Sequence, residues 1–165
     1  MFADAIEKVG GFTRPIKTIT RNYKEPAVIP GLATLFFVND NGCAVTCKHV
    51  AQQIIASQEI IKRYAEYKAA CARVPERKGK AAAIKKLELV HKLKAGAPIQ
   101  EKVQFDGAVS NFTGFDINLH PDLDLALIRF KGFERVLYKG HAVLVKDMKQ
   151  VRPGDMLCRL GFPFP

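Results

Sequence analysis

A histidine and an aspartate at two predicted strand boundaries are the residues best suited to chemistry in this chain. His49 follows a predicted strand over 43–46, and Asp124 opens an apolar run over 124–130. An imidazole titrates near neutral pH, so a histidine beside a loop can act as acid or base. A carboxylate that holds one ring nitrogen fixes the tautomer and stabilises the imidazolium that forms when the other nitrogen takes a proton. His49 and Asp124 could therefore form two-thirds of a nucleophilic triad.

The residues alone leave two interpretations of Asp124 open. An aspartate that starts a core strand is expected to be partly buried, and a buried carboxylate needs a partner. That partner is either the His49 imidazole, or a turn or a nearby lysine, in which case both residues are structural. The distance between the imidazole and the carboxylate decides, because a catalytic pair requires about 2.6–3.2 Å.

Short strands and turns must position the two residues. The apolar run 32–38 precedes Asn39-Asp40-Asn41-Gly42, whose Asn-Gly suits a turn with positive φ, and the strand 43–46 follows. Further strands are predicted over 102–109, with a turn at Asp106-Gly107, and over 115–119, 124–130, 142–145 and 156–161. This pattern predicts a mainly β fold, an antiparallel barrel or sandwich.

A helical hairpin is predicted between residues 51 and 100, because apolar residues there recur at helical spacings. Pro75 and Gly79 separate the two helices, and Gly96 ends the second. The apolar positions expected to face a core are Ile54, Ile61, Tyr64 and Ala65, then Ile84, Leu87, Val90 and Leu93. Residues 1–27 are predicted to form a lead-in with a short helix over 2–9, and residues 28–165 the main domain.

Positive charge is concentrated in the predicted hairpin. The chain carries +10, and residues 51–100 hold 11 Lys or Arg against 4 Glu, a net +7 that leaves +3 for the remainder. Such a concentration of lysine and arginine is typical of a solvated helix face. The same positive charge could also dock an acidic protein or nucleic acid. Nucleic acid is disfavoured because Tyr64 and Tyr67 are the only aromatic residues there. The candidate docking residues are Lys78, Lys80, Lys85 and Lys86.

Cysteine and histidine spacing predicts neither a metal site nor a cofactor. Cys43, Cys47, Cys71 and Cys158 show no Cys-x-x-Cys pattern, and His49, His91, His120 and His141 are widely separated. We expect free thiols, as in a reducing compartment. The chain has no apolar run of membrane-spanning length and no secretory signal at its start, so a soluble, cytoplasmic protein is expected.

Three short motifs, in order, resemble the first half of a trypsin-like serine peptidase, especially the bacterial high-temperature-requirement (Deg) type. Val45-Thr46-Cys47-Lys48-His49-Val50 is similar to the family's Thr-x-x-His-Val, and Asp124-Leu125-Ala126-Leu127-Ile128 to its catalytic-aspartate motif. Arg152-Pro153-Gly154-Asp155, through Leu160-Gly161-Phe162-Pro163-Phe164, resembles the Gly-Asp…Gly-x-Pro-Phe strand that closes the first barrel.

The resemblance implies a trypsin-like, six-stranded antiparallel β-barrel, the first of the family's two, with the helical hairpin 51–100 as an insertion. It implies a hydrolase, a serine protease that cleaves a polypeptide through an acyl-enzyme without a cofactor. His49 would be the general base and then the acid, and Asp124 would orient it.

The chain departs from the family in three places. Gly31-Leu32-Ala33-Thr34-Leu35 replaces the usual Gly-Ser/Thr-Gly pattern, and the stretch after His49 exceeds the family's usual connection. The nucleophile motif Gly-x-Ser-Gly-Gly is absent, because the only serines are Ser57 and Ser110, neither between glycines. We therefore expect a truncated domain whose catalytic triad is completed by a second barrel beyond residue 165, and a fragment that is inactive alone.

The alternative is a non-catalytic, peptidase-like module that binds through its basic hairpin. In a third possibility the hairpin regulates the peptidase.

Overall fold

The computed structural model describes residues 2–76, 79–147 and 160–162. In chain order the elements are α1 (Phe2–Gly10), β1 (Thr13–Asn22), β2 (Val28–Phe37), β3 (Cys43–Thr46), α2 (Lys48–Ala72), α3 (Lys80–Val90), β4 (Pro98–Phe105), β5 (Val109–Ser110), β6 (Gly114–Leu119), β7 (Ala126–Lys131) and β8 (Arg135–Val136). The chain divides into two compact units. Unit 1 holds Met1–Lys17, Leu32–Ala51 and Phe105–Pro165, and unit 2 holds Thr18–Gly31 and Gln52–Gln104.

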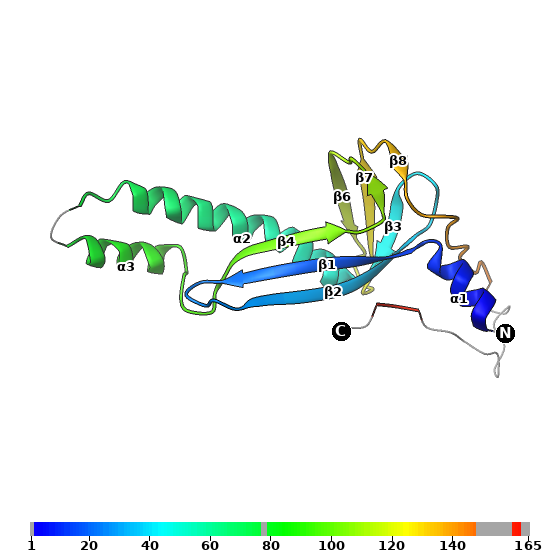
Figure 1. Cartoon of the computed structure of the whole chain (residues 1–165), viewed down its shortest axis with the longest axis horizontal. Coiled ribbons are helices and arrows are strands. Elements are labelled where there is room, and N and C mark those ends of the chain that lie inside the picture. Colours follow the sequence, from blue (N-terminus) through cyan, green and yellow to red (C-terminus); the bar gives the residue numbers. More distant parts are fainter. Residues whose placement is uncertain (1, 77–78, 148–159, 163–165) are drawn as a thin grey trace. The chain divides into compact units, whose positions relative to one another are not determined.

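The prediction of a mainly β fold is confirmed. Six strands form one antiparallel curled sheet, half of a barrel, in the order β4-β1-β2-β3-β7-β6, and β5 pairs separately with β8. In unit 1, β3 lies beside β7, and β7 beside β6 (Figure 1). The register pairs Thr46 with Ala126. The residues that follow β3 and those that precede β7 therefore meet at the same end of the sheet.

An aromatic core supports the turn that leads into β3. Phe37 is fully buried and stacks on Tyr138, with ring centroids 3.5 Å apart. The Tyr138 hydroxyl donates to the Asn39 carbonyl at 2.8 Å and accepts the Gly42 N–H at 3.0 Å. Gly42 has φ 71, as the Asn-Gly turn predicts. These contacts fix the chain direction just before the candidate site.

Unit 2 contains α3 and most of α2, together with a polar cluster between Tyr23, Tyr67 and Glu88. The Tyr23 hydroxyl contacts the Tyr67 hydroxyl at 2.9 Å and donates to Glu88 Oε1 at 2.7 Å. Desolvation by burial is the main cause that raises the pKa of Tyr67. The expected apolar faces are only partly buried: Ile54 and Leu93 are in the core, but Ile61 and Val90 are 48% and 66% exposed. The expected burial of one face of the second helix was wrong, because no residue of α3 is buried and the helix ends at Val90, before Leu93.

Other elements also differ from the sequence prediction. Residues 1–27, expected as a lead-in, contain β1, an interior strand of the sheet. Residues 142–145 form no strand, and Val143 is 86% exposed. The Ala142 N–H donates to the Phe37 carbonyl at 2.8 Å and ties this segment to β2. The strand predicted over 156–161 lies mostly outside the described residues.

Across the residues that the structure describes, no helix combines the length and the apolar character needed to cross a bilayer.

Candidate active site at the His49–Asp124 pair

His49 lies in the first turn of α2 and not at the end of a strand. β3 ends at Thr46, whose hydroxyl donates to the Thr34 carbonyl at 2.8 Å, and α2 begins two residues later at Lys48. Position 47, before the helix, is cysteine, which lacks the side-chain oxygen of a usual N-cap residue. The early start of α2 therefore carried no capping signal in the sequence.

The loop between β6 and β7 presents Asp124. His120 closes this loop, because its N–H donates to the Leu125 carbonyl at 2.9 Å and its Nδ1 accepts the N–H groups of Asp122 and Leu123. Lys48 Nζ donates to the Pro121 carbonyl at 2.9 Å and so ties α2 to the same loop. His120 therefore stabilises the loop that presents Asp124.

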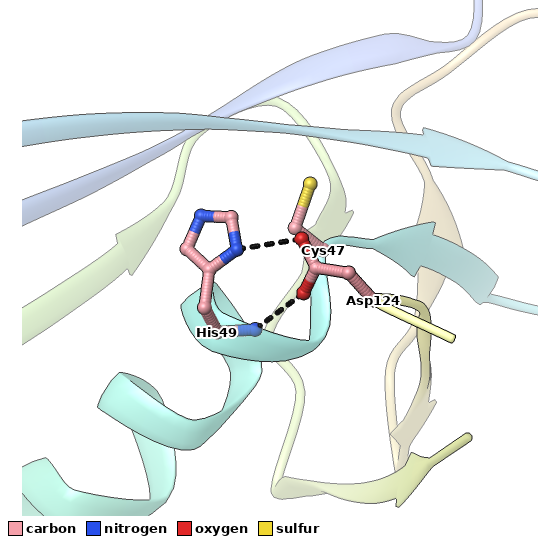
Figure 2. Close-up of side chains that lie close together, drawn as sticks. All are labelled: Cys47, His49 and Asp124. Carbon is pink, nitrogen blue, oxygen red and sulfur yellow. Dashed lines mark hydrogen bonds and ion pairs between the residues drawn. The ribbon is translucent and has the colours of Figure 1, made fainter. Parts of the chain in front are cut away.

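Asp124 binds His49 through both of its carboxylate oxygens (Figure 2). Asp124 Oδ2 lies 2.8 Å from His49 Nδ1, and Oδ1 accepts the His49 backbone N–H at 3.0 Å. The other ring nitrogen, Nε2, points away from Asp124 (Figure 2). The two interpretations of Asp124 are therefore not exclusive, because one carboxylate holds the imidazole and also satisfies an N–H of the first turn of α2.

The contacts with His49 hold the pKa of Asp124 below its usual range. The largest cause is the hydrogen bond from the His49 backbone N–H, and the bond from the imidazole is the second. The positive end of the α2 dipole also favours a carboxylate at this place. Burial of Asp124 was wrongly expected: its side chain is 58% exposed and that of His49 is 69% exposed. β7 begins at Ala126, so Asp124 belongs to the loop and not to the core strand.

This arrangement can perform proton transfer. A carboxylate at Nδ1 favours the tautomer with the proton on Nδ1, which leaves the Nε2 lone pair free to accept a proton. The Asp124 carboxylate makes one hydrogen bond to the His49 ring and one to the His49 backbone N–H. These two bonds define the direction of Nε2 before any substrate binds.

A second histidine–aspartate pair provides a comparison within unit 1. His141 Nδ1 lies 3.1 Å from Asp40 Oδ1. No motif pointed to this pair, because its members are 101 residues apart and neither begins an apolar strand. Within the described residues this pair has a single hydrogen bond, because the His141 backbone N–H does not donate to Asp40.

Within the part of the chain that the structure describes, neither Ser57 nor Ser110 is hydrogen-bonded to the His49 imidazole. The Ser57 hydroxyl is buried in α2 and donates to the Ile54 carbonyl at 2.7 Å. The Ser110 hydroxyl is directed to the Arg135 carbonyl at 3.4 Å. Each serine therefore has a structural partner of its own.

Cys47 lies beside the His49–Asp124 pair and was not among the site residues predicted from the sequence. One donor atom each of Cys47, His49 and Asp124 lie within 4.8 Å of one another (Figure 2). Metal-site spacing rules look for ligands that are close in sequence, whereas Asp124 lies in the loop before β7, far along the chain from Cys47 and His49. The sequence signal for this group was limited to the Cys47-Lys48-His49 spacing. Cys43, Cys47 and Cys71 are free thiols, and Cys158 lies outside the described residues.

The candidate docking residues belong to unit 2. A cavity of about 540 Å³ is lined by residues of α2, of α3 and of their connection, among them Arg73, Val74, Lys80, Lys86 and Leu87. Lys80 forms an ion pair with Glu76. Lys85 is exposed on α3 but does not line the cavity, and Lys78 lies outside the described residues.

Comparison with known proteins assigns no family to the chain. No protein-family model matches it, and no curated protein is significantly similar to it. The motif resemblance and the geometry of the His49–Asp124 pair are therefore the basis of the functional proposal.

Proposed function

We propose that this chain supplies the histidine and aspartate of a trypsin-like serine endopeptidase of the high-temperature-requirement type. In this proposal the curled sheet belongs to the amino-terminal barrel, and α2 and α3 are an insertion into it. The observation that supports the proposal most is the double hydrogen bond between Asp124 and His49, with Nδ1 and Oδ2 2.8 Å apart. It provides the orientation that a general base of a triad requires.

In the proposed reaction His49 Nε2 takes the proton of a serine hydroxyl while the serine oxygen attacks the scissile carbonyl. Asp124 stabilises the imidazolium that forms, and the imidazolium then gives its proton to the leaving amine. Water, activated by the same nitrogen, hydrolyses the acyl-enzyme and regenerates the serine. The serine and the oxyanion hole are assigned to residues outside the printed sequence, because Ser57 and Ser110 are bonded elsewhere.

The test is labelling with a fluorophosphonate, which reacts with an activated serine. We expect protein expressed from its full coding region to be labelled and to hydrolyse unfolded polypeptide, and the 165-residue chain to be inert in both assays. Labelling of Ser57 or Ser110 would contradict the assignment of the nucleophile. A coding region without a serine beyond residue 165, or an unlabelled and inactive full-length protein, would contradict the function.

A second candidate function is the docking of an acidic protein segment on unit 2. The cavity of about 540 Å³ combines apolar residues, Val74, Leu87 and Val90, with the cations Arg73, Lys80 and Lys86. This mixture suits an amphipathic segment that carries Asp or Glu. Nucleic acid is not favoured, because Tyr67 is buried against Tyr23 and offers no stacking surface.

Charge reversal at Lys85 and Lys86 tests this second function with poly-glutamate as the probe. We expect the double change to glutamate to weaken binding roughly 10-fold at low salt, because two attractions become repulsions. The control is the same double change at Lys8 and Lys139, both exposed in unit 1. Equal losses in the two variants would indicate only a net-charge effect. Tighter binding of single-stranded DNA than of poly-glutamate would contradict an acidic protein partner.

A further inference from the structure

We propose that Cys47, His49 and Asp124 form a binding site for a divalent transition-metal ion, with zinc as the best chemical match. The donor atoms of these three residues, a thiolate sulfur, a ring nitrogen and a carboxylate oxygen, lie within 4.8 Å of one another. They come from the segment between β3 and α2, from the first turn of α2 and from the loop before β7 (Figure 2).

The donor set selects the kind of ion. Sulfur and imidazole nitrogen are ligands of zinc and related transition metals, whereas calcium and magnesium require oxygen ligands throughout. Three protein ligands with an open fourth position for water match the usual tetrahedral zinc arrangement. On binding, the Cys47 thiol releases its proton to solvent, because the thiolate is the ligand.

The distances fit an ion of this size after a small side-chain adjustment. Zinc binds sulfur at about 2.3 Å and nitrogen or oxygen at about 2.0–2.2 Å, so two of its ligand atoms are at most roughly 4.5 Å apart. All three side chains are exposed, so they can rotate inward without disturbing a packed core. The backbone beneath them is held by the pairing of β3 with β7 and by the bond from Asp124 to the His49 N–H.

Lys48 lies between Cys47 and His49 in the sequence, and its side chain is directed to the loop before β7. Its ammonium donates to the Pro121 carbonyl at 2.9 Å. This hydrogen bond positions the ammonium at the loop and leaves its positive charge unchanged. The Asp124 carboxylate supplies an oxygen ligand and a negative charge for the ion.

Metal binding and the proposed catalytic role exclude each other. His49 Nδ1 and Asp124 Oδ2 are 2.8 Å apart. An ion that binds both atoms would displace the proton between them, and this proton would move through solvent to Nε2. The imidazole can then no longer work as an oriented base. If the proposed peptidase function is correct, zinc would inhibit the enzyme reversibly and a chelator would restore its activity.

The experiment is a titration of the reduced 165-residue chain with Co²⁺, which reports its ligands by absorption. We expect one equivalent to bind with intense visible bands of a tetrahedral ion and a thiolate-to-cobalt charge-transfer band, and zinc to displace the cobalt. Cys47→Ser should abolish the charge-transfer band, and His49→Gln should weaken binding at least about 10-fold. Cys43→Ser, Cys71→Ser and Cys158→Ser are matched controls that should leave the spectrum unchanged.

A second readout requires no variant. Zinc should protect the Cys47 thiol from alkylation, as mapped by peptide mass, and should leave Cys43 and Cys71 as reactive as in the metal-free chain. An unchanged charge-transfer band in Cys47→Ser, a weak octahedral cobalt spectrum or alkylation of Cys47 at the same rate with zinc would each overturn the proposal. The titration uses no peptidase assay, so its failure and a failure of the proposed function are distinguishable.

Discussion

Replacement of His49 by glutamine should lower kcat for peptide-bond hydrolysis about 10⁶-fold in the protein expressed from its full coding region. Glutamine has no group that accepts a proton near neutral pH, so the serine would attack without a base. The substrate-binding groups remain in place, so KM should change much less than kcat. The measurement is steady-state hydrolysis of an unfolded protein substrate in chelator-treated buffer, together with the rate of fluorophosphonate labelling.

The matched control for His49→Gln is His141→Gln. His141 also pairs with an aspartate, at 3.1 Å, and belongs to the same unit. Its replacement should leave kcat unchanged. Equal activity of His49→Gln and the unaltered protein would exclude His49 as the base. Loss of activity in both variants would indicate a general effect of removing a surface histidine, and would contradict the specific role of His49.

The sequence predicted the strands of unit 1 well where local signals agreed. The Asn39–Gly42 turn combined an Asn-Gly pair with apolar runs on both sides, and β7 followed from a dense apolar run whose two faces are fixed by pairing with β3 and β6. The pairing of His49 with Asp124 was deduced from their chemistry and from the motif resemblance. Local periodicity could not show it, because their contact depends on the register of β3 against β7.

Features that depend on tertiary contacts were missed. Asp124 was expected in a core strand, but the strand begins two residues later and the carboxylate stabilises the start of α2 from a loop. Cys47 is not a usual N-cap residue, so the sequence did not predict where α2 begins. The residue that accepts an N–H of the first turn is Asp124, which lies in the loop before β7. The apolar pattern of α3 suggested that one face of the helix would be buried, but no residue of α3 is buried. Helical periodicity predicts that an apolar face exists, but it does not predict whether another element covers that face. The proximity of Cys47 to Asp124 was missed for the same reason, because it depends on the pairing of β3 with β7.

The second large effect is expected for Asp124→Asn, which preserves the shape of the side chain and removes its charge. The amide oxygen can still accept the His49 backbone N–H, but the amide nitrogen would donate to Nδ1. Nδ1 then acts as acceptor, the ring proton moves to Nε2, and the base lone pair is lost from the substrate side. We expect kcat to fall about 10⁴-fold. In the 165-residue chain, the ¹⁵N chemical shifts of His49 should show the change of tautomer directly.

Asp124 has two roles: it sets the His49 tautomer, and it accepts a backbone N–H at the start of α2. Folding stability measures the second role, whereas the ¹⁵N chemical shifts measure the first. The pKa of Asp124 is lowered in the folded chain, first by the bond from the His49 backbone N–H and then by the imidazole. Its stabilising contribution is therefore complete above the unfolded pKa of about 3.9 and is lost as the pH falls through the folded pKa. Asp124→Asn should unfold at a lower temperature than the unaltered chain at neutral pH, and the difference should disappear in strong acid. Asp40→Asn is the matched control and should leave the His49 tautomer unchanged. An unchanged tautomer in Asp124→Asn, with lowered stability, would leave Asp124 as a helix-capping residue only and would remove the structural basis of the peptidase proposal.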